Sequence, residues 1–469
     1  MSNALLSQKV IFDRRLIDKY NRSGPRYTSY PTAPHFHEGF GPQKWREYAH
    51  RSNQETPDKP ISLYVHIPFC DTVCYYCACN RVVTPDRSRA VEYLEYLFRE
   101  IEQVGKLFSR KREVVQLHLG GGTPTYLSLE QLTRLQACLG EHFTLAQGDK
   151  GEFGVEVDPR EVPKGTLTGM RQLGYNRISI GVQDLDFNVQ KAVNRIQPQE
   201  ITWQAVEEAR QAGFQSINLD LIYGLPLQSE VTFSHTLEKV IRELSPDRLA
   251  IFNYAHLPQY FSPQRRVNEA QLPTPEEKLR ILEAAIQILT KAGYVYVGMD
   301  HFAKPDDELA VAQRQGLLHR NFQGYTTHGE CDLVSVGITA ISQVGPTYAQ
   351  NLKTLESYYE RLNAGELSIF RGLELTPDDL IRRQVIMRLI CDFQLDRAWV
   401  EQQFGLIFGD YFQAEQIELA AMVEEGLLEE EGSILRVTPG GRLLIRNVCL
   451  VFDWYLRNAL QNKTFSKTI

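Results

Sequence analysis

The stretch ISLYVHIPFCDTVCYYCACN, residues 61–80, decides the fold class of this chain. Its first seven residues form an apolar and β-branched run, which is typical of a buried strand. Four cysteines then follow within ten residues, at Cys70, Cys74, Cys77 and Cys79. The N-terminal segment lacks the apolar core of a signal peptide, so we expect a reducing compartment. In that setting a thiol cluster indicates metal or redox chemistry rather than disulfides.

Five further strand-like runs follow the first, and stretches with helical apolar spacing separate them. The runs are 114–119, 153–157, 177–180, 216–222 and 248–252, and the helical stretches include 90–107, 129–139, 202–212 and 232–244. Strands that alternate with helices predict parallel βαβ units. Six units in a row favour a full or partial barrel over an open sheet.

The chain divides into three predicted regions. Residues 1–60 are rich in Pro, His, Tyr and Arg without long periodicity, which predicts an extended arm with short helices. Residues 61–371 hold the barrel and an extension. Thr376-Pro377-Asp378 then marks a helix start, and we predict a separate, mainly helical domain over 372–469.

Composition excludes several classes of function. The 469 residues include 51 Lys and Arg against 58 Asp and Glu, a net charge of −7, which disfavours general nucleic-acid binding. Hydrophobic residues at 43% and charged residues at 23% are ordinary for a globular protein. No run approaches the ~18 apolar residues of a membrane helix. We therefore expect a cytoplasmic protein without nucleic-acid or membrane partners.

The first three loop cysteines have the spacing C-x3-C-x2-C. Three thiolates from one loop can hold three irons of a four-iron cluster and leave the fourth iron open to a substrate or cofactor. Zinc sites usually combine two separated Cys or His pairs, and no second pair lies at ribbon spacing here, which leaves zinc as the weaker alternative. The loop follows a strand, and barrel enzymes place their chemistry at the carboxyl ends of strands. Cys138, Cys331, Cys391 and Cys449 are scattered and predicted to be core residues.

Other strand ends carry residues suited to ligand binding. Gly120–Gly122 end the second run and allow a tight turn or close backbone approach to a ligand. Glu156 and Asp158 end the third run, where carboxylates can bind hydroxyl or amino groups; a helix cap is the alternative for Asp158. Arg22 and Arg26 precede the barrel and suit an anionic substrate or an acidic surface of the protein itself.

Ten segments, in order along the chain, resemble the oxygen-independent coproporphyrinogen III oxidase (dehydrogenase) family of the radical S-adenosylmethionine (SAM) superfamily. They are GPRYTSYPTA (24–33), YVHIPFC (64–70), Cys79, GGGTPT (120–125), EVDPRE (156–161), SIGVQD (179–184), DLIYGLP (220–226), FNYAHLP (252–258), FQGYTT (322–327) and the stretch 340–351. The resemblance implies a partial (βα)6 TIM-like barrel, with the N-terminal arm covering the active site and a small, mainly helical C-terminal domain.

The resemblance also implies a reaction. The family converts the propionates on rings A and B of coproporphyrinogen III to vinyls, giving protoporphyrinogen IX in haem biosynthesis. Cys70, Cys74 and Cys77 would hold a [4Fe–4S] cluster whose open iron binds SAM. Cleavage of SAM would yield a 5′-deoxyadenosyl radical that removes hydrogen from the substrate.

Site residues carry over from the family position by position. SAM on the cluster is expected to meet Tyr64, Tyr76, Gly121, Glu156 and Ile341. A second SAM is expected to meet Gly122, Thr123, Gln183, Arg195, Asp220 and Ala255. Cys79 is expected to be needed for activity without being a ligand. Substrate contacts are predicted for Arg22, Arg26, Phe322 and Gln323.

Partners and alternatives complete the prediction. The resemblance implies an electron donor such as a flavodoxin or ferredoxin, an unidentified electron acceptor and a monomeric chain. One alternative is a haem chaperone of the same superfamily, although such paralogues usually lack the fourth cysteine and the 24–33 segment. A zinc-stabilised interaction protein is a further alternative from a different class.

Overall fold

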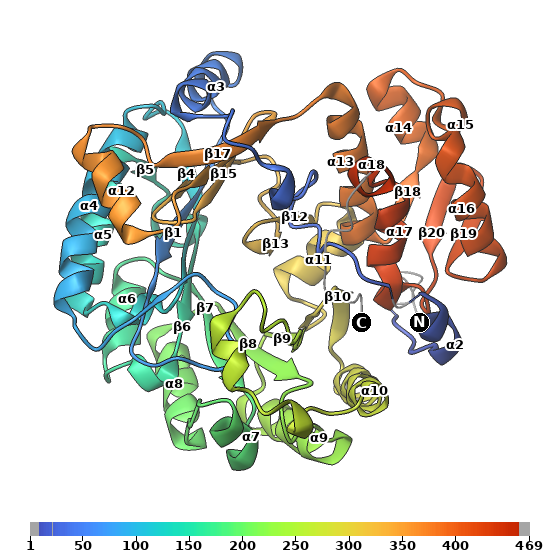
Figure 1. Cartoon of the computed structure of the whole chain (residues 1–469), viewed down its shortest axis with the longest axis horizontal. Coiled ribbons are helices and arrows are strands. Elements are labelled where there is room, and N and C mark those ends of the chain that lie inside the picture. The colour runs from blue at the N-terminus through green and yellow to red at the C-terminus, as the bar shows by residue number, and fades with distance from the viewer. Residues whose placement is uncertain (1–8, 21, 459–469) are drawn as a thin grey trace.

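The computed structural model describes residues 9–20 and 22–458 (Figure 1). A curved sheet with helices on its outer side forms the larger part of the molecule, and a helical lobe lies beside it, drawn in red in Figure 1. In the described part of the chain, no helix combines the length and apolarity that a membrane crossing requires.

Six parallel strands form the centre of the large sheet, in the order β1-β4-β6-β7-β8-β9. They are β1 (Ile61–Ile67), β4 (Glu113–Gly121), β6 (Glu152–Val157), β7 (Arg177–Gln183), β8 (Ser216–Tyr223) and β9 (Arg248–Asn253). The helices between and after them are α4 (Ser88–Gly105), α5 (Leu129–His142), α6 (Thr166–Gln172), α7 (Phe187–Ala192), α8 (Gln199–Ala212), α9 (Glu230–Lys239) and α10 (Pro275–Lys291). Short strands β2 (Phe69–Cys70), β3 (Val82–Val83) and β5 (Thr144–Leu145) complete this region. The predicted run of six strand–helix units is confirmed.

The parallel strands direct apolar side chains to one face of the sheet and polar side chains to the other. In β7, Ile178, Ile180 and Val182 are buried, whereas Ser179 and Gln183 are half-buried, so the residues alternate strictly. Because successive side chains of a strand point to opposite faces, the apolar set packs under the helices and the polar set faces the barrel interior. This alternation places polar groups where a ligand can reach them.

The sheet extends beyond the six strands on both sides. β14 (Asp332–Val336) pairs parallel with β1, and β15 (Ile341–Val344), β16 (Thr347–Asn351) and β17 (Ile369–Glu374) follow as antiparallel strands. At the other side, β11 (His301–Ala303) and β10 (Val295–Gly298) add antiparallel to β9. The hairpin β12 (His319–Asn321) and β13 (Gly324–Thr326), with α11 (Glu308–Gln315) and α12 (Leu355–Asn363), completes the extension. The predicted boundary at residue 372 falls inside β17, and the division into domains stays a prediction.

The C-terminal lobe begins with α13 (Pro377–Asp392), whose capping box on Thr376 matches the predicted start signal. It continues with α14 (Arg397–Phe404), α15 (Phe408–Tyr411), α16 (Gln413–Glu424), α17 (Ile445–Val451) and α18 (Trp454–Arg457), beside a three-stranded sheet of β18 (Gln394–Asp396), β19 (Leu428–Glu431) and β20 (Ile434–Val437).

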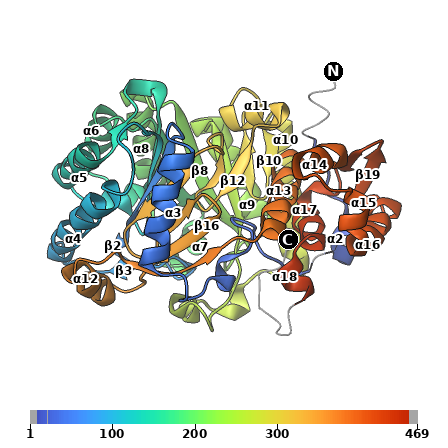
Figure 2. The same cartoon turned by 90° about the horizontal axis from the view of Figure 1, so that it is seen from above.

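The N-terminal arm contacts both lobes. Its helix α2 (Arg14–Tyr20) lies with the C-terminal lobe, whereas α3 (Pro42–Glu55) packs on β15 and β16 of the barrel (Figure 2). Between these helices the chain is held by the C-terminal lobe: the Tyr27 hydroxyl donates to Asp453 at 3.0 Å, and Arg446 Nε donates to the Pro25 carbonyl at 2.8 Å. The arm therefore joins the two lobes.

Candidate active site

Twelve of the predicted site residues line one cavity of about 290 Å³ at the carboxyl ends of the parallel strands. They are Cys70, Cys74, Tyr76, Cys77, Cys79, Gly121, Gly122, Thr123, Glu156, Gln183, Arg195 and Asp220. These residues come from segments up to 150 positions apart, so it is the parallel strand order that brings them together. A polar hollow at this end of a barrel is the expected place for an active site.

The cysteine loop is wrapped tightly over the end of β1. Its backbone is fixed by hydrogen bonds from Tyr75 N to the Val193 carbonyl at 2.9 Å and from Cys77 N to the Cys74 carbonyl at 3.2 Å. Burial raises the pKa of the Cys70 thiol to about 12, whereas a hydrogen bond from Cys79 lowers the pKa of Cys77 to about 6. These hydrogen bonds thus hold the loop backbone that carries the thiols in one conformation.

The thiol spacing bears on which metal group the loop can hold. Among the described residues, one group of three metal-binding side chains has all its ligand atoms within 4.8 Å of one another, and it lies elsewhere, at His328, Glu330 and Cys331. No three of the loop thiols have all their sulfur atoms within 4.8 Å of one another, whereas thiolates on one tetrahedral zinc ion, with Zn–S bonds of about 2.3 Å, would all lie roughly 3.8 Å apart. The loop therefore suits a cluster in which each thiolate binds a different iron.

Glu156 is positioned by the glycines of β4. Its carboxylate accepts a hydrogen bond from Gly121 N at 3.2 Å and lies 3.2 Å from Nε2 of His118. A Cβ atom on Gly121, whose φ is +122°, would lie 2.7 Å from the His66 ring, so only glycine fits there. Burial would raise the pKa of Glu156, but its contacts with His118, the Gly121 amide and His66 together hold that pKa below its ordinary value.

Arg195 connects the cysteine loop to Asp158. Its guanidinium donates to the Asp158 carboxylate and to the Gly181 carbonyl, both at 2.8 Å, and lies 3.5 Å from the Cys74 sulfur. Burial would raise the pKa of Asp158, but Arg195 and Arg160 lower it to about 2. Asp158 also accepts from the Arg160 amide, so the predicted cap and the charged contact occur together.

Two polar atoms at the floor of the cavity have no partner in the described structure. They are Oε1 of Gln183 and Nε of Arg195, and both are buried. Gln183 also has φ +68°, an uncommon backbone conformation that clusters at functional sites. Because buried polar groups are normally hydrogen-bonded, these atoms indicate that the cavity is shaped for a polar ligand.

Asp220 completes the floor beside them. Its carboxylate accepts from the Ser179 hydroxyl at 2.8 Å and from the Asn218 amide at 2.7 Å. Burial raises the pKa of Asp220 to about 6. The group is thus mostly ionised at neutral pH, where its carboxylate can accept hydrogen bonds from ligand hydroxyls, and it becomes neutral as the pH falls below about 6.

The remaining predicted residues do not line this cavity. Tyr64 stacks on the His118 ring beneath Glu156, with centroids 6.0 Å apart. Ile341 and Phe322 pack together on an apolar cluster of the extension. Gln323 lines a neighbouring cavity of about 200 Å³ that Glu156 and Asp220 also line.

A further cavity of about 410 Å³ is lined by Ala255 and by Arg26, which forms an ion pair with Asp300. Arg22 is exposed, with its guanidinium 5.9 Å from the Tyr20 ring centroid, and lines none of these cavities. Sequence reasoning missed His118, because its partner Glu156 lies on a different strand, and it missed His66, whose ring contacts the Tyr64 hydroxyl and the Asn80 carbonyl.

Comparison with known proteins places this geometry in a family. Residues 64–240 match the Radical SAM superfamily profile, and residues 375–444 match the HemN C-terminal domain profile. Proteins named oxygen-independent coproporphyrinogen III oxidase are 51% identical over 98% of this chain and 99% of their own length in Pseudomonas aeruginosa, and 47% identical over 98% of both chains in Synechocystis. The chain belongs to the oxygen-independent coproporphyrinogen III oxidase family.

A solved member of this oxidase family has the same fold. The structure described as coproporphyrinogen III oxidase from Escherichia coli, a radical SAM enzyme, matches with a TM-score of 0.90 and 48% identity, over 96% of this chain and all of that one. The predicted fold class and the assignment to radical SAM oxidoreductases are therefore confirmed. Membership of the superfamily implies SAM and a [4Fe–4S] cluster as cofactors.

Proposed function

We propose that the chain catalyses the oxygen-independent oxidative decarboxylation of two propionates of coproporphyrinogen III to vinyls, giving protoporphyrinogen IX. Each propionate loses a β-hydrogen atom, CO₂ and one electron that passes to an acceptor. The observation that supports this most is that the three loop cysteines and most of the predicted SAM-binding residues line one cavity, in a chain that matches the oxidases over nearly its whole length.

We propose that Cys70, Cys74 and Cys77 hold the [4Fe–4S] cluster. When bound, the cluster and SAM supply the reducing electron and the carbon radical that begins the reaction. Arg195, which lies 3.5 Å from the Cys74 sulfur, places a positive charge beside the loop and contributes, after Cys79, to lowering the pKa of Cys77.

The protein's own residues bind and orient the polar parts of SAM. Glu156 offers a carboxylate fixed by Gly121 and His118, which suits an amino or hydroxyl group. Gln183 and Asp220 offer acceptors at the floor, with Gly122, Thr123 and Ala255 nearby, and we propose these residues for a second SAM. Tyr64 and Ile341 are proposed to contact the first SAM, as the resemblance to the family implies.

The adjoining cavity of about 410 Å³ suits the anionic substrate. Arg26, Lys278 and Arg446 line it, from the arm, the barrel and the C-terminal lobe. Burial lowers the pKa of Arg26 to about 10, so the guanidinium remains cationic at neutral pH. Phe322 and Gln323 lie on the extension side and are proposed to complete the substrate site.

The mass of the product tests the proposal. Anaerobic incubation with coproporphyrinogen III, SAM and a reductant should yield the divinyl product, which is lighter by two CO₂ and four hydrogen atoms. Cys70→Ser should abolish the product and the visible absorption of the cluster together, while Cys138→Ser should retain both. Stable haem binding without CO₂ release would instead support the chaperone alternative.

The identities of the electron donor and the electron acceptor, a monomeric state and a cytoplasmic location stay predictions.

A further inference from the structure

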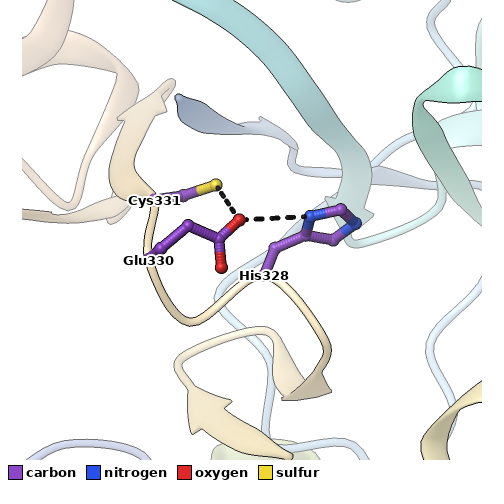
Figure 3. A group of neighbouring side chains, drawn as sticks. All are labelled: His328, Glu330 and Cys331. Atoms are coloured by element: carbon purple, nitrogen blue, oxygen red, sulfur yellow. Dashed lines mark hydrogen bonds and ion pairs between the residues drawn. The ribbon is translucent and has the colours of Figure 1, made fainter. Parts of the chain in front are cut away.

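We propose that His328, Glu330 and Cys331 form a binding site for one Zn²⁺ ion, separate from the cysteine loop. The three residues lie in the short connection between β13 and β14. Figure 3 shows the Glu330 carboxylate between the Cys331 sulfur and the His328 ring, with all three side chains turned toward one another. Sequence reasoning predicted Cys331 only as a core residue.

The spacing of the ligand atoms fits a single ion. Glu330 Oε1 lies 3.7 Å from Nδ1 of His328 and 3.7 Å from the Cys331 sulfur, and all three atoms lie within 4.8 Å of one another. A tetrahedral zinc ion with ordinary bond lengths holds such atoms roughly 3.4–3.6 Å apart. The two distances to Glu330 therefore need to close by only a few tenths of an ångström around the ion, and the distance between His328 and Cys331 by at most roughly 1.3 Å.

A second carboxylate orients the histidine. Nε2 of His328 lies 3.6 Å from Oε2 of Glu152, the first residue of β6, and Glu152 is itself held by a 2.8 Å hydrogen bond from Gln116. Metal-binding histidines commonly turn their other ring nitrogen to a carboxylate, which fixes the ring and the tautomer. His328 thus has the outer contact of a ligand as well as the inner one.

The donor set selects the class of metal. A thiolate with an imidazole and a carboxylate suits the borderline-soft Zn²⁺ ion, whereas Ca²⁺ and Mg²⁺ require oxygen ligands throughout. Cys331 is buried, while the side chains of His328 and Glu330 are 21% and 58% exposed, so the ion can enter from solvent. A cavity of about 100 Å³ borders His328 and Cys331 and has room for a water as the fourth ligand.

The position of the site separates it from the active site. Asp332, which follows Cys331, pairs with Ile61 at the start of β1, whereas the cysteine loop follows the end of that strand. A bound ion would tie the connection before β14 to itself and, through Glu152, to β6. Because an ion that binds only the folded state stabilises it, zinc should raise the thermal midpoint without taking part in catalysis.

Metal content of the cluster-loaded full chain tests the site. After dialysis against Zn²⁺, we expect one zinc per chain in addition to the cluster iron. His328→Gln and Glu330→Gln, which change partly exposed side chains, should reduce the zinc to near zero, as should Cys331→Ser. Cys138→Ser, a half-buried cysteine on α5, should retain it. No zinc in the unsubstituted chain, or full zinc in His328→Gln, would overturn the proposal.

Cobalt provides a second readout that identifies the ligands. In a full-length Cys70→Ser/Cys74→Ser/Cys77→Ser background, which removes the loop thiols, Co²⁺ should give a thiolate charge-transfer band and the visible bands of tetrahedral coordination. Adding Cys331→Ser to that background should remove the charge-transfer band. Persistence of the band would assign the metal to another cysteine and contradict the site.

Discussion

Asp220 shows how a single buried carboxylate can be prepared for a ligand at a cost in stability. Its two hydrogen bonds, from Ser179 and Asn218, do not compensate fully for burial, because its pKa is raised to about 6 from an ordinary value near 3.9. The folded chain therefore prefers the neutral acid. Its stability contribution is fully present below pH ~4 and is lost as the pH rises through about 6.

Asp220→Asn should therefore stabilise the cofactor-free chain at alkaline pH. A shift of about two pKa units corresponds to at most about 3 kcal/mol, so we expect a gain of roughly 2 kcal/mol in the free energy of unfolding at pH 8. At pH 4 the gain should vanish, since the amide then replaces a neutral acid of the same shape. Urea unfolding at both pH values measures this.

The exposed Asp58 provides the control for that experiment, since Asp58→Asn changes the same charge on the surface. A gain for Asp220→Asn that is equal at both pH values would contradict the linkage. The same substitution should weaken SAM binding, because the amide cannot accept from two hydroxyls as the carboxylate can. Greater stability with weaker binding is the usual compromise at a functional site.

We propose that Cys79 differs in role from Cys70, Cys74 and Cys77. It is hydrogen-bonded to Cys77, and three thiolates suffice for a cluster with one open iron. Cys79→Ser should therefore keep the iron content and visible absorption of the reconstituted chain while losing most activity. Cys77→Ser should lose both. Loss of iron in Cys79→Ser would show that the fourth cysteine is a ligand after all.

At the scale of elements, local pattern predicted the barrel strands well. The run 61–67 and the run 216–222 match β1 and β8 within one residue, because β-branched runs between helical stretches are a local signal. The strands β14 to β17 were not predicted individually. Their identity depends on pairing: β14 lies beside β1 although about 270 residues separate Ile61 from Asp332.

The candidate site likewise combines residues that the sequence predicts with contacts that arise only when the chain folds. The spacing of Cys70, Cys74 and Cys77 predicted them as cluster ligands, the family segment 156–161 contains Glu156, and Arg195 was predicted by position from the family although it lies outside the quoted segments. The hydrogen bond of His118 to Glu156 and the contact of Arg195 with Cys74 arise between separate strands and loops, so no local pattern contained them. Cys331 was predicted as a core residue, because only the folded connection between β13 and β14 brings its thiol close to the side chains of His328 and Glu330.

The attachment of β14 depends on a buried ion pair. Arg112, whose side chain is fully buried, donates to Asp332 at 2.6 Å and to the Lys59 carbonyl at 2.7 Å, and it also reaches Ser52 of α3. Arg112→Met leaves a buried carboxylate with fewer partners, and such losses cost about 3 kcal/mol or more. We expect a loss of that size in chemical unfolding of the cofactor-free chain.

Lys111, the adjacent and exposed residue, gives a matched control. Lys111→Met should change the free energy of unfolding by less than about 0.5 kcal/mol, as is usual for surface substitutions. Because Arg112 lies at the start of β4, away from the cysteine loop, iron reconstitution should be unchanged in both variants at low temperature. A stable Arg112→Met chain would show that Lys59, with the hydrogen bonds from Ser52 and the Gly345 amide, can compensate Asp332.

At the scale of the whole molecule, three regions build one cavity. Arg26 of the arm, Asp300 of the barrel extension and Arg446 of the C-terminal lobe meet around the space of about 410 Å³. Consecutive residues of β9 connect it to the cofactor cavity, since Phe252 lines the cofactor cavity and Asn253 lines the larger one. The arm, once folded, thus contributes directly to the proposed substrate site.

Arg26 and Arg22 of the arm should therefore differ in their effect on substrate binding, because only Arg26 lines the larger cavity. Arg26→Ala should raise the KM for coproporphyrinogen III by roughly 10- to 100-fold, since a charged hydrogen bond to a propionate contributes about 1.5–3 kcal/mol. Iron content and SAM binding should be unchanged, because Arg26 lines neither the cysteine loop nor its cavity. Arg22→Ala, in the same segment but exposed, should change KM less than twofold. Equal effects of the two variants would mean that the arm acts by general positive charge near the entrance, and the ion pair of Arg26 with Asp300 would then be structural.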